Sequence, residues 1–421
     1  MSQQHTNSTR LRGLLPLLAV LLALALSGPP AQAQKNSNKK TKPASGVQGP
    51  PTTSFDIRKI VWPTPPEVAR VKFEDILTGQ PIDWAGLESK KKQKMSWMDR
   101  LAGVQPDDQV KDAEKKIGFQ LIRVYGVTAD SKGNIYAADQ AVGAIFIFPY
   151  DKNQPLQLIK NGQDAHFGLI NGLAIDDNDR LFVSDLKLHR VLVFNAKHEL
   201  ETSFGGDTLV SPAGVALDTA NRFAYVVDTQ LDQVLVFDAD SYKLLRRIGT
   251  SGKKHTLTDA GDFSLPTNVA VDQQGNVYVT DTLNNRVESF DADGNFIGQF
   301  GKAGDGPGYF ARPKGIAIDC DGHIWVADEV QNRVQVFDPS GRLLIYFGGL
   351  GWYPGQFQAL YGIAYDSKHN RVITSEQFPG RVQVFQYVTD AEAAAEKARR
   401  GAGSETPAPK PAGSTSQKGG E

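Results

Sequence analysis

Apolar and polar residues alternate with a period of two in six segments along the middle of the chain. The segment "KGIAIDCDGHIWVAD" shows the arrangement: an alternating stretch, a turn containing Gly and Asp, and a second apolar stretch that ends on Asp328. A period of two is typical of β-strands. The equivalent acidic residues recur every 43 to 53 residues, which indicates a repeated structural unit. They are Asp139, Asp185, Asp228, Asp281, Asp328 and Glu376.

Each of the first five units contains four short alternating stretches, which we name strands a to d in chain order. In residues 315–348, turns containing Gly, Asn and Asp separate these stretches. Four antiparallel strands in about 45 residues are typical of a β-propeller blade. The sequence therefore predicts an all-β fold, a six-bladed β-propeller of four-stranded antiparallel blades. The alternative is an open solenoid, which would leave exposed sheet edges and need capping repeats.

The sixth unit contains three strands instead of four. It ends at "RVQVFQYV", and the Ala- and Glu-rich residues 389–400 predict a short helix with Thr389 as its N-cap. The fourth strand must come from elsewhere, because an unpaired sheet edge invites association with other chains. Residues 69–77, "ARVKFEDIL", alternate in the same way and precede the first unit. We therefore predict that this N-terminal strand closes the last blade.

The two ends of the chain differ in composition from the repeats. Arg10 and Arg12 precede a short apolar run and the small residues Ala31 and Ala33, a pattern typical of a secretory signal peptide. The run is shorter than a bilayer-spanning helix requires, and the alternative is an uncleaved anchor. The sequence thus predicts an exported protein, periplasmic or extracellular, with no membrane span after signal cleavage. The predicted segments are a signal peptide (1–33), a disordered linker (34–54), a lead-in with the closing strand and a short surface helix (55–118), the propeller (119–388), a short helix (389–400) and a disordered tail (401–421).

Composition narrows the classes of function. The 421 residues include 46 Lys and Arg and 47 Asp and Glu, so no overall electrostatic field favours nucleic acid. The single cysteine, Cys320, excludes an intrachain disulfide and a cysteine-based zinc site. The sequence contains no Gly-x-Ser-x-Gly, phosphate-loop or haem-attachment motif.

Two units carry a motif that runs from a proline before strand a to an Asn-Arg pair that opens strand c. The motif is clearest in residues 266–301 and 313–348, and it resembles the NHL repeat. The resemblance covers about residues 122–388 and the closing strand, although Ala144 and Gln233 replace the arginine in blades one and three. It implies a six-bladed propeller, a fold that mostly serves as a binding platform and less often as an enzyme. The segment "WPTPPEVARV" is also similar to the lead-in of exported bacterial propellers of this type.

The strand order predicts where ligands and partners bind. Strands a to d alternate in direction, so the b–c and d–a connections share one face, which we call the first face. Residues that enter strand a lie nearest the central channel, and the loop "GLGWYPGQF" adds aromatic side chains. The short turns of the opposite face are predicted to be scaffold. The binding-face candidates are Tyr125, Asn171, Thr267, Lys314, Tyr361, Trp352 and Tyr353.

In four blades an arginine follows the acidic residue of strand b after five positions. The pair could bind a ligand, but a pair that recurs from blade to blade is better explained by a role within each blade. The acidic side chain can accept N–H bonds from the b–c loop, and the arginine can pair with an acid of its own or a neighbouring blade. We therefore interpret the pairs as structural clips: Asp185–Arg190, Asp281–Arg286, Asp328–Arg333 and Glu376–Arg381.

Three histidines, His166, His189 and His255, belong to loops of the first face. They resemble the zinc ligands of the amidating lyases, which share this fold, but they do not follow the lyase order around the blades. Zinc or calcium therefore remains an alternative, with no cofactor firmly implied. The sequence favours a non-enzymatic protein-binding or scaffold module of the cell envelope, with a protein or an envelope polymer as its partner. The alternative is a metal-dependent propeller enzyme, amidating-lyase-like or lactonase-like.

Overall fold

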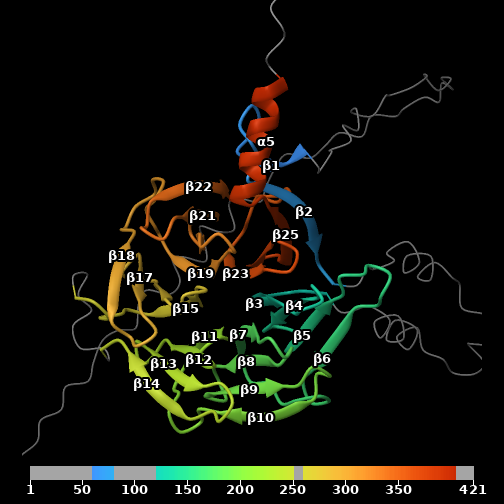
Figure 1. The fold of residues 1–421 in the computed structure, drawn as a ribbon. Coiled ribbons are helices and arrows are strands. Elements are labelled where there is room, and N and C mark those ends of the chain that lie inside the picture. Colours follow the sequence, from blue (N-terminus) through green and yellow to red (C-terminus); the bar gives the residue numbers. More distant parts are fainter. Residues whose placement is uncertain (1–58, 80–119, 251–258, 404–421) are drawn as a thin grey trace, which may run out of the picture. The chain divides into compact units, whose positions relative to one another are not determined.

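The computed structural model describes residues 59–79, 120–250 and 259–403, which form six antiparallel sheets arranged in a ring (Figure 1). The ring confirms the prediction of an all-β, six-bladed propeller. The predicted signal peptide, linker, short surface helix and most of the C-terminal tail lie outside the described residues. In the part of the chain that the structure describes, no helix has the length and apolar character needed to cross a bilayer.

The first three blades each contain four strands in the order a to d. Blade one consists of β3 (Val124–Ala129), β4 (Ile135–Asp139), β5 (Ala144–Phe148) and β6 (Gln157–Lys160). Blade two consists of β7 (Ile170–Ile175), β8 (Leu181–Asp185), β9 (Arg190–Phe194) and β10 (Leu200–Phe204). Blade three consists of β11 (Pro212–Asp218), β12 (Phe223–Asp228), β13 (Gln233–Asp238) and β14 (Leu244–Ile248).

The next two blades repeat this pattern, and the sixth combines both ends of the domain. Blade four consists of β15 (Pro266–Val271), β16 (Val277–Asp281), β17 (Arg286–Phe290) and β18 (Phe296–Phe300). Blade five consists of β19 (Pro313–Ile318), β20 (Ile324–Asp328), β21 (Arg333–Phe337) and β22 (Leu343–Gly348). Blade six consists of β23 (Leu360–Asp366), β24 (Arg371–Gln377), β25 (Gly380–Tyr387) and β2 (Val71–Leu77), with the short β1 (Val61–Trp62) added outside.

The core of the propeller lies between neighbouring blades. Every residue of the b strands β4, β8, β16 and β20 is buried, because each sheet packs against another sheet on both faces. One core cluster joins Tyr278 of blade four to Ile316 and Phe337 of blade five. The outer strand β22 instead alternates between partly buried and exposed residues, as expected for a sheet edge that faces solvent on one side. Burial therefore alternates along this outer strand, whereas it does not alternate along these b strands.

The innermost strands approach one another so closely that they require glycine. A Cβ atom added to Gly315 would lie 2.6 Å from the carbonyl oxygen of Tyr361 on the next blade. Gly126, Gly172 and Gly362 meet a neighbouring backbone in the same way. Blade four carries Asn268 instead, and its side chain lies against Gly214 of blade three. The recurring glycine of strand a thus follows from the packing of the blades around the axis.

The last blade is closed by the N-terminal strand, as predicted. β2 pairs antiparallel with β25, with Val71 opposite Tyr387 and Leu77 opposite Val382. The observed strand begins two residues later than the expected 69–77 segment. It covers the edge of β25 and contributes Val71 and Phe73 to the core between blades five and six. Both ends of the domain are therefore joined in one sheet.

A helix follows blade six. α5 (Asp390–Gly403) starts at a capping box, in which Thr389 Oγ1 accepts from the Glu392 N–H at 3.3 Å and Glu392 Oε2 accepts from the Thr389 N–H at 3.0 Å. Arg70 pairs with Asp390 at the first turn. Arg400 donates to the carbonyl of Pro66 at 3.0 Å. The helix is thus attached to the segment that leads into β2.

Candidate functional site

The acidic residue at the end of each strand b is buried and satisfied by nearby loops. Asp185 is fully buried, and its carboxylate accepts N–H bonds from Leu169 at 2.9 Å, Lys187 at 3.0 Å and Leu188 at 2.9 Å. Equivalent N–H bonds reach Asp139, Asp228 and Asp328. Each carboxylate therefore ties the b–c loop to the d–a connection of the same face.

The arginines that follow these acids behave differently from blade to blade. Arg286 Nε lies 2.8 Å from Asp281, and Arg381 Nε lies 2.7 Å from Glu376. Arg190 is exposed and donates to the carbonyl of Leu188 at 3.2 Å. Arg333 lies over the ring of Tyr346, 5.3 Å from its centroid. In the described structure the pairing with the strand-b acid is therefore present in blades four and six.

Blade four contains a further buried acid beside its ion pair. Glu288 is fully buried, lies 2.5 Å from Arg286 Nη2, and accepts the N–H of Gly261 at 2.8 Å. Burial raises the pKa of Glu288 to about 7, although the nearby Arg286 opposes this change. Burial also raises the pKa of Asp281. One guanidinium thus neutralises two buried carboxyl groups, which favours retention of a proton.

The predicted binding residues at the start of strand a meet at the channel entrance. The rings of Tyr125 and Tyr361 are 4.6 Å apart, and Tyr361 Oη donates to Asn171 Oδ1 at 3.3 Å. Lys314 Nζ lies 5.7 Å from the centroid of the Tyr361 ring. The backbone carbonyl of Lys314 accepts a hydrogen bond from Thr267 Oγ1 at 3.2 Å. These contacts join residues of five blades into one packed cluster, so the structure brings this set of predicted residues together.

Burial limits what the residues at the channel entrance can contact. Asn171, Thr267, Lys314 and Tyr361 are all buried, whereas Tyr125 is half-buried. Burial lowers the pKa of Lys314 even though Glu329 lies 4.0 Å from its ammonium group. Burial raises the pKa of Tyr361, because it disfavours the charged form of the tyrosine as it does that of the lysine. The entrance is thus filled by its own side chains in the described structure.

Exposed apolar side chains also gather in two loops of the first face. Trp352 is 59% exposed, Tyr353 69% and Leu350 71%, and all three belong to the connection between blades five and six. Phe378, 67% exposed, comes from the b–c loop of blade six, and its ring lies 6.5 Å from that of Trp352. We call Leu350, Trp352, Tyr353 and Phe378 the aromatic patch.

The backbone beneath the aromatic patch is held in place by buried polar groups. Arg381 Nη1 donates to the carbonyl of Trp352 at 2.8 Å, and its Nη2 donates to the carbonyl of Gln356 at 2.7 Å. Gln383 Oε1 accepts the N–H of Gly355 at 2.8 Å. The ion pair of Glu376 with Arg381 therefore positions the loop that displays Trp352.

Phe378 is the member of the aromatic patch that the sequence interpretation missed. It occupies the b–c loop of blade six in "EQFPGR", where blades four and five carry Thr282–Asn285 and Glu329–Asn332. The equivalent positions are Leu283 and Val330, which are also exposed and apolar, so the aromatic ring of Phe378 was the available signal.

The histidines considered as metal ligands are placed differently from one another. His166 and His189 are exposed, and His189 Nδ1 bonds to the carbonyl of Val210. His255 lies outside the described residues. Among the described residues, the one group of three His or acidic side chains close enough to share an ion is Asp321, His323 and Asp390, on the opposite face.

That group on the opposite face already has internal partners. His323 Nδ1 lies 3.1 Å from Asp319 Oδ2 and 3.0 Å from Tyr387 Oη, and the bond to Asp319 raises the pKa of the histidine. Asp321 Oδ2 accepts the N–H of Asp390 at 2.8 Å, and Arg70 pairs with Asp390. The cluster therefore anchors the start of α5 to blade five.

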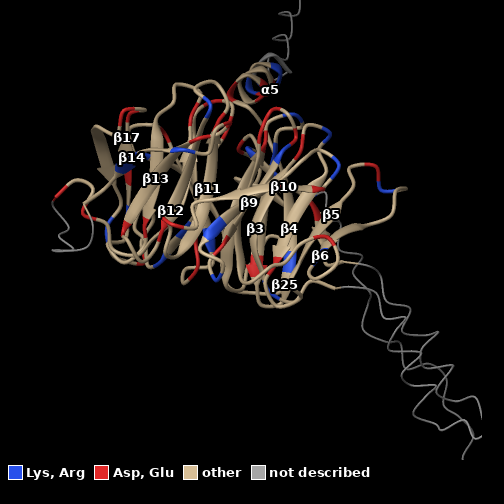
Figure 2. Cartoon of the chain, turned by 90° about the horizontal axis from the view of Figure 1, so that it is seen from below, with Lys and Arg blue, Asp and Glu red and all other residues tan. Residues whose placement is uncertain are grey.

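Charged residues of both signs are interspersed in the loops on either side of the ring (Figure 2). This distribution agrees with the formal net charge of -1.

Comparison with known proteins agrees with this architecture. A family model described as "6-bladed beta-propeller" matches residues 258–354. The fold is a six-bladed β-propeller. A solved structure of a protein of unknown function from Bacteroides thetaiotaomicron is similar, with a TM-score of 0.52 and 18% identity over 63% of this chain and 70% of that chain. At this identity the similarity concerns the fold alone.

Two enzymes are also among the similar proteins. A probable peptidyl-alpha-hydroxyglycine alpha-amidating lyase from Caenorhabditis elegans is 30% identical over 114 residues. The matched region is 27% of this chain and about a third, 32%, of the lyase. A gluconolactonase from Xanthomonas campestris has a TM-score of 0.48 and 16% identity over 63% of this chain and 86% of that chain.

Proposed function

We propose that this protein is an exported, NHL-type propeller that binds a partner protein of the cell envelope through its aromatic patch. The observation that carries the proposal is the contact between Trp352 and Phe378, two exposed aromatic rings from separate loops of the first face. Single exposed apolar residues are common on protein surfaces, but a contiguous apolar cluster is typical of an interaction site. Trp and Tyr are also the residue types most often found at the centre of interfaces.

The rigid support of the aromatic patch favours binding. Because Arg381 and Gln383 hold the loop backbone, little conformational entropy is lost when a partner covers the rings. The channel entrance offers less accessible surface to a partner, since Tyr361 and Lys314 are buried there. A partner is therefore expected to lie across the first face rather than enter the channel.

Binding can be tested by removing the two aromatic side chains of the longer loop. The partner is first identified by cross-linking and is then purified by itself. Trp352→Ala combined with Tyr353→Ala should weaken the affinity for this partner at least tenfold, about 1.4 kcal/mol. Thermal melting should change little, because both side chains are exposed. The measurement is a titration calorimetry comparison with the unchanged chain.

A matched control removes equally apolar side chains from the outer strands. Leu245→Ala combined with Ile297→Ala alters exposed residues of β14 and β18, and it should leave the affinity unchanged. Equal affinity of the Trp352 and Tyr353 variant and this control would refute the aromatic patch as the binding site. Retention of a polysaccharide in place of a protein would assign the patch to an envelope polymer and refute the protein partner.

The alternative is a metal-dependent lyase or lactonase, which the local identity to the amidating lyase supports. His166 and His189 are the described residues that would supply ligands, with His255 as the third. Metal analysis of the purified chain distinguishes the two functions. One equivalent of zinc that is lost in His189→Ala would favour the enzyme.

A further inference from the structure

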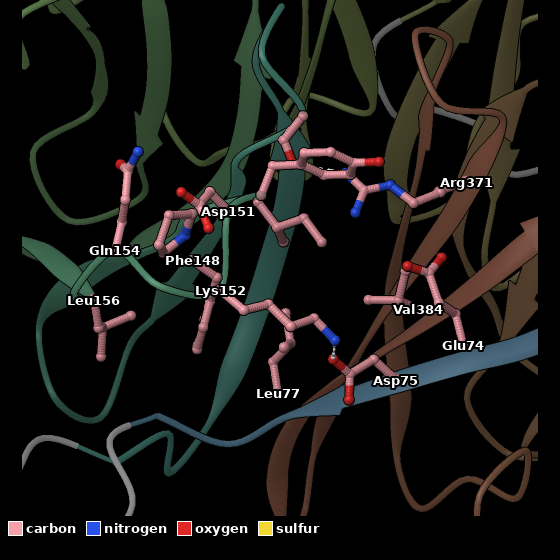
Figure 3. Close-up of a pocket in the computed structure, with 14 residues that line it drawn as sticks. Glu74, Asp75, Leu77, Phe148, Asp151, Lys152, Gln154, Leu156, Arg371 and Val384 are labelled. Carbon is pink, nitrogen blue, oxygen red and sulfur yellow. Dashed lines mark hydrogen bonds and ion pairs between the residues drawn. The ribbon is translucent and has the colours of Figure 1, made fainter. Parts of the chain in front are cut away.

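A cavity of about 600 Å³ is lined by residues of blades six and one, none of which belongs to the aromatic patch (Figure 3). Blade six contributes Glu74, Asp75 and Leu77 from β2, together with Arg371 and Val384. Blade one contributes mainly the end of β5 and its connection to β6. A cavity of this size matches those that hold small organic molecules.

The cavity wall from blade six contains an irregular strand. Phe73 pairs with Phe385 and Asp75 pairs with Val384, so Glu74 is an extra residue in β2. Consecutive residues of a regular strand point to opposite faces, whereas a bulge turns one of them. Glu74 and Asp75 consequently both line the cavity. Figure 3 shows the two carboxyl groups on the same side of it.

Most charges in the cavity are already neutralised. Lys152 Nζ lies 2.6 Å from Asp75, and Arg371 Nη2 lies 2.7 Å from Asp366. The Arg371 guanidinium also donates to the carbonyl of Gly133 at 2.6 Å. Each of these two cations thus has a carboxylate partner, and neither partner is Glu74.

Glu74 forms no ion pair among the described residues. Asp151, the other lining carboxylate without an ion pair there, accepts the N–H of Asn153 at 3.0 Å. The Oε2 atom of Glu74 is buried and has no hydrogen-bond partner among the described residues. A buried carboxylate oxygen without a partner is unfavourable, because its desolvation is not compensated by a hydrogen bond. The charge of Glu74 therefore favours a cationic group from outside the chain.

The remaining lining of the cavity is largely apolar. Leu77 and Val384 from blade six face Phe148, Pro149 and Leu156 from blade one. These side chains would bury a hydrocarbon body of about the size of a six-carbon chain, and each buried CH₂ group favours binding. A ligand that fits has an ammonium group at one end and an apolar body at the other.

We propose that this cavity binds a small organic ammonium ion, with its charged group paired to Glu74 and its apolar body against Leu77, Phe148 and Leu156. The site lies apart from the aromatic patch, so it is independent of the proposed protein partner. The bulge of β2 gives the site its charge, and the junction of the two blades gives it its apolar wall.

The test uses the full chain and three probes of equal length: hexylammonium, hexanol and hexanoate. NMR chemical-shift titration should show hexylammonium binding at least tenfold more tightly than hexanol, and hexanoate more weakly than either. Glu74→Gln should abolish the preference for hexylammonium. The matched control Glu201→Gln, which changes an exposed residue of β10, should retain it.

A second variant keeps the carboxylate and fills the space. Leu156→Trp should weaken hexylammonium binding at least tenfold while the thermal melting temperature stays within a few degrees. Equal binding of hexanol and hexylammonium to the unchanged chain would overturn the proposal. Undiminished hexylammonium binding in both Glu74→Gln and Leu156→Trp would also overturn it.

Discussion

At the scale of single residues, the acid of strand b and the arginine after it have separate roles. Asp185 is fully buried and accepts four N–H bonds, while Arg190 is exposed and contacts other groups. Arg286 and Arg381 are buried and do pair with the acid. The acid is therefore the common element of the first face, and the arginine contributes where burial removes water from the pair.

The buried pair of Asp281 and Arg286 leads to a prediction about pH, because Glu288 shares the same guanidinium. The pKa of Glu288 in the folded protein, about 7, lies above its usual value near 4.5. Its contribution to the free energy of unfolding is therefore complete below pH 4.5 and is lost as the pH rises through 7. The loss amounts to at most about 3 kcal/mol at pH 8.

Urea unfolding of Glu288→Gln and of the unchanged chain at pH 5 and pH 8 measures this effect. The stability of Glu288→Gln relative to the unchanged chain should increase between pH 5 and pH 8, because glutamine does not ionise. The exposed Glu201→Gln serves as a control and should show no such increase. A constant difference for Glu288→Gln at both pH values would contradict the shifted pKa.

At the scale of secondary-structure elements, the inner strands leave no space for a side chain at the recurring glycine. We predict that Gly315→Ala lowers the free energy of unfolding by about 2 kcal/mol or more, because the alanine Cβ would lie 2.6 Å from the backbone carbonyl oxygen of Tyr361. Chemical denaturation measures the change.

The matched control for this glycine is Gly298→Ala in the outer strand β18. The nearest atom to a Cβ there is Ser289 Oγ at 3.8 Å, so the free energy of unfolding should change by less than about 0.5 kcal/mol. A similar loss in both variants would show that backbone entropy, rather than close packing, explains the glycine.

At the scale of the whole molecule, β2 holds the ring together. We predict that a chain beginning at residue 80 melts at a lower temperature and self-associates, because it exposes the edge of β25 and removes Val71 and Phe73 from the core. Size-exclusion chromatography and thermal melting measure these changes. A chain beginning at residue 59 retains β1 and β2 and should behave as the full chain does.

The ring architecture was predictable because each blade repeats a local pattern. Alternation of apolar residues, turn glycines and a regular spacing specify four strands in each unit, and the three-strand count of the last unit required a partner such as β2. The bounds of β2 were two residues too long, since alternation does not define where pairing begins. β1 was not expected as a fifth strand of that sheet.

The candidate sites were less predictable, because they depend on contacts between residues far apart in the sequence. The sequence placed Tyr125, Asn171, Lys314 and Tyr361 at one face, but their burial follows from side chains of several blades filling the same channel entrance. The cavity at the blade junction was not expected, because the opposite face was interpreted as scaffold. Its charge arises from a bulge at Glu74, which alternation alone cannot reveal.

The sequence by itself determined the number of blades, their strand order and the closing strand, because these follow from period, spacing and the need to pair a sheet edge. The tertiary structure alone decided which arginines pair with which acids, that Phe378 meets Trp352, and that Glu74 Oε2 has no hydrogen-bond partner among the described residues. These features depend on distances and burial between separate elements. A propeller repeats its scaffold locally, but its binding chemistry arises where blades and loops meet.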